Sequence, residues 1–196
     1  MRIQEINPAK LGTLFRKQFE LCNVKEGETI ALLSDLTSRR EYVQAAFAAA
    51  SELGADTYEL CVNSSPSWTK VGVETIGACK GTVDVLAAAD MLVCLHVPLF
   101  TKWMKTVRDA GTRVLMIIDA PDDLEQLMAP PGLREAVIHA GQRLEQTRTV
   151  RVTSDVGTDL TYDCGEYPTM IQYGFADEPR RFDHWGGGHV HTFPNE

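Results

Sequence analysis

The sequence lacks the long apolar runs of membrane proteins and the excess of positive charge that proteins binding nucleic acid carry. Among its 196 residues, 27 acidic side chains outnumber 19 basic ones, so the formal net charge at pH 7 is −8. A negative surface disfavours nucleic acid and anionic lipid as partners. No stretch reaches the roughly 18–20 apolar residues that a membrane-spanning helix needs, and residues 1–8 contain no apolar segment typical of a secretory signal. We therefore expect a cytoplasmic protein that binds neither membranes nor nucleic acid.

Several common site motifs are missing as well. The cysteines show no CxxC spacing, which disfavours a zinc site or a disulfide framework. No GxGxxG follows a strand, and no GxxxxGK[ST] is present, so neither common type of nucleotide site is indicated. The absence of GxSxG and HExxH removes the commonest hydrolase interpretations.

What the sequence does contain is an alternation of helical and strand periodicities. Hydrophobic residues make up 44% of the chain and charged residues 23%, as in ordinary globular proteins. We expect an N-cap for the second helix at Thr37 or Ser38 and a long loop at 64–80. The repeated strand-then-helix order predicts an α/β fold over residues 1–148, an open, mostly parallel, Rossmann-like sheet flanked by helices. The expected helices are 8–22, 42–53, 83–89, 98–110, 122–128 and 133–146, and the expected strands are 29–33, 56–62, 91–95 and 113–118.

The pattern changes after residue 148. Residues 149–153 and 159–163 alternate like antiparallel strands. From Gly165 onward the chain is dense in Gly, Pro, aromatic residues, Asp and His, with too little apolar periodicity for a core of its own. We therefore expect residues 149–196 to form a short β-rich, irregular extension.

Histidines in this extension suggest two interpretations. His189 and His191 alternate along the chain, so in an extended segment both point to the same side. Imidazole and carboxylate together form the ligand set of non-haem iron. The alternative is a surface strand whose histidines contact solvent or a partner, and both interpretations stay open.

Two further histidines are candidates for binding. In Asp183-His184-Trp185 the acid can orient or charge the imidazole, and aromatic neighbours can wall a planar ligand; the alternative is a structural turn. His96 directly follows an expected strand, and open α/β sheets bind ligands beyond the carboxyl ends of their strands. A packed loop histidine is the alternative there.

The tail also resembles a known family. The matching segments are Gly-Glu-Tyr-Pro at 165–168, Tyr-Gly-Phe-Ala-Asp-Glu-Pro at 173–179, Arg181, Asp-His-Trp at 183–185 and Thr-Phe-Pro-Asn-Glu at 192–196, with weaker likeness at 89–90 and 110–116. They resemble the 2,5-dihydroxypyridine 5,6-dioxygenases of nicotinic acid breakdown, in a superfamily shared with thermophilic metallo-aminopeptidases.

This resemblance implies an enzyme that uses Fe(II) and dioxygen to open the ring of 2,5-dihydroxypyridine to N-formylmaleamate. In the family, two His and one Asp from the carboxyl-terminal half hold the iron. Family members are nearly twice as long as this chain. We therefore expect the metal ligands to lie beyond its end, and the chain to be inactive unless it pairs with such a half. A homo-oligomer is also expected.

The resemblance further implies roles for individual residues. His184 matches a residue that binds or deprotonates a ring hydroxyl, and the expected substrate contacts are Gln172, Tyr173, Asp183, His96 and Phe100. At two of these positions the sequence departs from the family, which has a glutamate at the position of Gln172 and a histidine at that of Phe100. These departures leave open a relative that acts on another hydroxylated ring, or a hydrolase resembling metallo-aminopeptidases. A non-catalytic binding module is a third alternative.

Overall fold

The computed structural model describes residues 7–63, 76, 81–97, 99, 101–164 and 167–192. The chain forms two compact units. Unit 1 comprises Met1–Met128 and Gly174–Gly186, and unit 2 comprises Ala129–Tyr173 and Gly187–Glu196.

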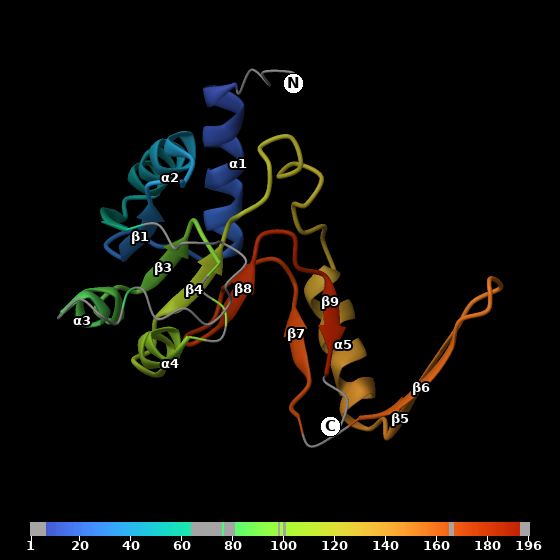
Figure 1. The fold of residues 1–196 in the computed structure, drawn as a ribbon. Coiled ribbons are helices and arrows are strands. Elements are labelled where there is room, and N and C mark those ends of the chain that lie inside the picture. The colour runs from blue at the N-terminus through green and yellow to red at the C-terminus, as the bar shows by residue number, and fades with distance from the viewer. Residues whose placement is uncertain are drawn as a thin grey trace. The chain divides into compact units, whose positions relative to one another are not determined.

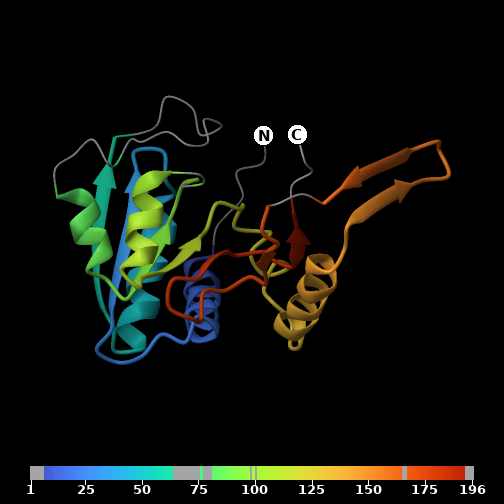
Figure 2. The ribbon, with the colours of Figure 1, turned by 90° about the horizontal axis from the view of Figure 1, so that it is seen from below.

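Unit 1 is a five-stranded parallel sheet with helices on both faces (Figure 1). The strands run in the order β2-β1-β3-β4-β8, and Figure 2 shows β1 and β2 side by side. Helices α1 and α2 pack together over one face, and α3 and α4 over the other. This arrangement confirms the predicted fold class. The helices are α1 Pro8–Leu21, α2 Arg40–Glu52, α3 Thr82–Ala87 and α4 Lys102–Asp109, and the strands are β1 Thr29–Asp35, β2 Asp56–Val62, β3 Met91–Cys94, β4 Arg113–Met116 and β8 Phe182–His184.

The central strands are apolar because both of their faces are covered. Every residue of β3 and β4 is buried, and so is all of β1 after its first residue. Continuous apolar runs of this kind are typical of parallel strands between two helical layers. Alternate side chains of these strands pack with α3 and α4 in one core cluster that includes Leu33, Leu92, Val114 and Phe182.

Unit 2 consists of one helix and two small antiparallel sheets. Strands β5 and β6 pair with each other at the residues predicted from the sequence, and β7 pairs with β9. Helix α5 packs on β7 and β9. The elements are α5 Leu133–Glu145, β5 Thr149–Thr153, β6 Asp159–Asp163, β7 Met170–Gln172 and β9 His189–His191.

Two local predictions were wrong, and one strand was missed. The N-cap of α2 is Arg39, because Thr37 and Ser38 instead donate hydrogen bonds to the carboxylate of Asp35. Residues 122–128 form turns instead of a helix. Strand β8 was not anticipated and joins the parallel sheet beside β4.

Two other expectations concern the loop at 64–80 and membrane-spanning helices. The predicted loop at 64–80 lies outside the described residues except for Ile76. Within the described part of the chain, no helix has both the length and the apolar character needed to span a bilayer.

Candidate functional site

The carboxyl edge of the unit 1 sheet gathers four ionisable side chains. Asp35 ends β1, His96 follows β3, Asp119 follows β4, and His184 ends β8. Because all five strands are parallel, these positions lie at one edge of the sheet, where open α/β folds bind their ligands. The edge therefore places two of the predicted site residues, His96 and His184, in one unit.

His184 stands between two buried anchors. The fully buried carboxylate of Asp183 accepts hydrogen bonds from the backbone N–H of Gly174 and of His184, both at 2.9 Å. It also accepts from Nη2 of Arg181 at 2.7 Å. Trp185 is fully buried, and its Nε1 donates to the carbonyl of Leu124 at 3.0 Å. His184 itself is half-buried, so the fold fixes its backbone on both sides.

Asp119 is a candidate site residue that the sequence alone did not indicate. Burial raises the pKa of its carboxyl group, and the charge of His184 acts against this rise, so the two groups interact electrostatically. The loop that carries Asp119 is fixed because the hydroxyl of Tyr42 donates to the Asp119 carbonyl at 2.7 Å. The available signal was an acidic residue directly after an expected strand.

His96 and Asp35 form a second pair at the same edge. Nδ1 of His96 is buried without a hydrogen-bond partner among the described residues. Burial lowers the pKa of His96, against the opposing charge of Asp35. Burial also raises the pKa of Asp35, but hydrogen bonds from Thr37 and Ser38 and the charge of His96 outweigh it, so that pKa lies below its ordinary value. The pair therefore places an imidazole beside a carboxylate at this edge of the sheet.

The remaining predicted substrate contacts lie elsewhere. Gln172 ends β7 in unit 2 and is buried. Tyr173 is also buried there; its hydroxyl accepts from Nε of Arg134 at 3.4 Å, and the Arg134 guanidinium lies 5.6 Å from the ring centroid. Phe100 lies outside the described residues.

The described residues contain no group of three or more His, Cys, Asp and Glu side chains placed to hold a metal ion. His189 and His191 do lie on the same side of β9, as predicted, with ring centroids 5.3 Å apart and the rings stacked. Burial lowers the pKa of His191, and His189 lowers it further.

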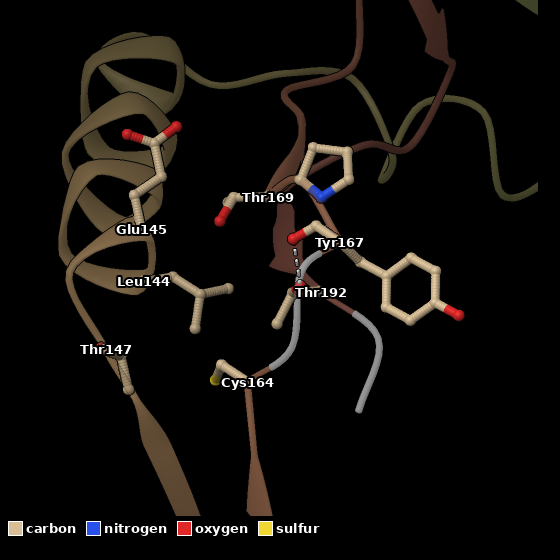
Figure 3. A pocket seen from close by; sticks show the side chains of 8 residues that line it. Leu144, Glu145, Thr147, Cys164, Tyr167, Thr169 and Thr192 are labelled. Carbon is tan, nitrogen blue, oxygen red and sulfur yellow. Dashed lines mark hydrogen bonds between the residues drawn. The ribbon is translucent and has the colours of Figure 1, made fainter. Parts of the chain in front are cut away.

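Two pockets lie within single units, and neither lining includes a predicted site residue. One, of about 220 Å³, lies in unit 2 between the end of α5 and the segments around Tyr167 and Thr192 (Figure 3). The other, of about 380 Å³, lies in unit 1 at the amino-terminal ends of β3 and β4, where Asp90 and Arg113 help to line it.

Comparison with known proteins identifies the family. The family model described as 2,5-dihydroxypyridine 5,6-dioxygenase matches residues 10–196. A curated 2,5-dihydroxypyridine 5,6-dioxygenase from Pseudomonas putida KT2440 is 30% identical over 97% of this chain and 57% of its own length. The solved structure of 2,5-dihydroxypyridine dioxygenase from the same organism superposes with a TM-score of 0.89 at 29% identity, with the same two coverages.

The chain thus spans a little over half the length of these relatives. The family match covers nearly all of its residues, including the carboxyl edge with His96, Asp119 and His184. The chain therefore belongs to the 2,5-dihydroxypyridine 5,6-dioxygenase family.

Proposed function

We propose that this chain is part of a dioxygenase that cleaves the ring of 2,5-dihydroxypyridine, or of a closely related hydroxylated ring, to a product of the N-formylmaleamate type. The observation that carries the proposal is the family match over residues 10–196. The position of His184 at the carboxyl edge of the sheet supports it.

His184 is the proposed acid–base residue. It binds a ring hydroxyl and takes up its proton, which raises the electron density of the ring and favours its oxidation. Asp119 lies close enough to His184 for their charges to interact, and Asp183 and Trp185 hold the backbone of His184 in place.

The other contacts have binding roles. His96 follows β3, which β4 alone separates from β8, so the two histidines lie at the same edge of the sheet. Gln172, Tyr173 and Phe100 remain the other proposed substrate contacts. An amide cannot take up a proton as a carboxylate does, so Gln172 binds without acting as a base.

Fe(II) is the proposed cofactor, and it would supply the activation of dioxygen. The described residues contain no group of three or more side chains placed to hold it. We propose that the ligands come from a carboxyl-terminal half, that the assembly is a homo-oligomer or such a pairing, and that it works in the cytoplasm.

Oxygen consumption tests the proposal. The chain is produced together with the part of the P. putida relative that it does not cover, loaded with Fe(II), and mixed with 2,5-dihydroxypyridine in an oxygen electrode. Oxygen uptake is expected, with a loss of about 10²–10⁴-fold in His184→Gln. His139→Gln, at an exposed position on α5, is the matched control and retains the rate.

Two results would contradict the proposal. One is an assembly that binds iron but consumes no oxygen with any dihydroxypyridine. The other is release of amino acids from short peptides in the presence of zinc or cobalt, which would identify a hydrolase resembling metallo-aminopeptidases. Absence of both activities would instead favour a non-catalytic binding module.

A further inference from the structure

The hairpin formed by β5 and β6 has one apolar face. Val150 pairs with Tyr162, and Val152 pairs with Leu160. Side chains of directly opposed residues in an antiparallel pair point to the same side, and every second residue returns to that side. All four apolar side chains therefore lie on one face of the hairpin. Val152 is 45% exposed and Leu160 54% exposed, so this face is open to solvent.

The opposite face is polar and satisfied by its own contacts. Nε and Nη2 of Arg151 contact the two carboxylate oxygens of Asp159, each at 2.8 Å. The hydroxyl of Thr149 donates to Asp163 at 3.0 Å. Since the charges on this face are already paired, a partner would stabilise the hairpin most by burying its apolar face.

The hairpin has little support within unit 2. Its two strands pack mainly against each other, and Figure 2 shows them extending from the end of α5. A two-stranded hairpin alone is at best marginally stable in water, and an exposed apolar patch on such an element indicates an interaction surface. The amphipathic hairpin is therefore expected to be stabilised by another layer of protein that covers Val152 and Leu160.

The charges at the two ends of the hairpin indicate what that layer is. Arg148 is exposed at the base, directly before β5, and Asp155 is exposed in the turn at the tip. Neither has an ion-pair partner among the described residues. When two hairpins pack face to face in opposite directions, the base of each lies against the tip of the other. Arg148 of one then faces Asp155 of the other, twice, as two-fold symmetry requires.

We propose that residues 149–163 form a dimerisation arm that packs its apolar face on the same face of a second copy of this chain. Val150, Val152, Leu160 and Tyr162 of the two copies form the apolar centre of this contact. The pairs between Arg148 and Asp155 fix its antiparallel direction. The proposal does not depend on the catalytic activity.

Two adjacent substitutions test the face. Leu160→Asp places a charge on the apolar face, and Thr161→Asp places the same charge on the polar face one residue away. Sedimentation velocity over a range of concentrations should show a dimer for the unmodified chain. Leu160→Asp should raise the dimer dissociation constant at least ~30-fold, as loss of a central apolar contact does, while Thr161→Asp leaves it nearly unchanged. Circular dichroism checks that both variants are folded.

A charge exchange tests the direction. Arg148→Glu and Asp155→Arg should each weaken the dimer, and the double variant should restore it, because the same pairs form with reversed sign. An unmodified chain that stays monomeric at every concentration would overturn the proposal and assign the apolar face to another partner. Equal effects of Leu160→Asp and Thr161→Asp, or a double variant as weak as the single ones, would also overturn it.

Discussion

Replacing Asp183 by Asn should destabilise unit 1 strongly although the side chain keeps its shape. The carboxylate is fully buried, and Arg181, its ion-pair partner, is 13% exposed. One oxygen accepts the backbone N–H groups of Gly174 and His184, and the other accepts Nη2 of Arg181 at 2.7 Å and Nε at 3.2 Å. An asparagine oxygen can keep the two backbone bonds, but its NH₂ group then faces the guanidinium.

The magnitude follows from what is lost. Two charge-assisted hydrogen bonds disappear, each worth about 1.5–3 kcal/mol, and Arg181 is left as a largely buried cation. Removing one partner of a buried ion pair costs about 3–5 kcal/mol. We therefore expect Asp183→Asn to lower the free energy of unfolding by about 3–5 kcal/mol. For a chain of this length, that corresponds to a fall of roughly 10 °C in the melting temperature.

Urea denaturation followed by tryptophan fluorescence measures this change in the relevant unit, since Trp103 and Trp185 are both buried in unit 1. Asp159→Asn is the matched control: it removes an equivalent bond to an arginine at an exposed site, where ion pairs contribute little. A loss below ~1 kcal/mol in Asp183→Asn would refute the view that this carboxylate anchors the site.

Further predictions concern His96 and two glycines within helices. Because burial lowers the pKa of His96 below 6.5, the unfolded chain takes up that proton first as the pH falls. Part of the stability of the folded chain should therefore be lost below about pH 6.5. His96→Asn should flatten this pH dependence of the free energy of unfolding in denaturation series from pH 8 to pH 5. In Asp35→Asn, NMR titration should show a further fall of the His96 pKa. Gly12→Ala in α1 has open space around the new methyl group and should stabilise the chain by ~0.5–1 kcal/mol. Gly141→Ala in α5 would bring its Cβ to 2.6 Å from Ile171 and should destabilise unit 2 by ~1–3 kcal/mol; equal melting temperatures for the two variants would contradict this.

The central sheet could be predicted from the sequence because its strands carry their own signal. β3 and β4 are short apolar runs bounded by polar residues, and β5 and β6 alternate in period two. β8 has no such signal, since its three residues are Phe182, Asp183 and His184. Its place depends on contacts distant in sequence, such as the bond from the N–H of Val114 to the carbonyl of Arg181 at 2.7 Å. Local periodicity contains no information on pairing of this kind.

The candidate site could be predicted from the sequence only in part. His184 was found through the family resemblance, and His96 through its position after a strand. Asp119 was missed because its importance comes from the approach of His184, which depends on the unexpected strand β8. Thr37 and Ser38 were assigned to a helix cap because a hydroxyl oxygen there can accept the first N–H groups of a helix. In the structure both hydroxyls instead donate to the carboxylate of Asp35.

The order Asp183-His184-Trp185 explains how the backbone of His184 is held firmly at the end of so short a strand. Successive side chains of a strand point to opposite faces, so the acid and the indole enter one layer while the imidazole faces the other. Trp185 packs against Phe15 of α1 with ring centroids 5.2 Å apart, and Phe182, two residues before His184, packs in the core with α3 and α4. Burial of Asp183 and Trp185 stabilises the backbone of His184 at the sheet edge. A site residue held by such a supporting shell keeps its geometry before substrate binds, and this is why loss of Asp183 should affect both stability and the proposed reaction.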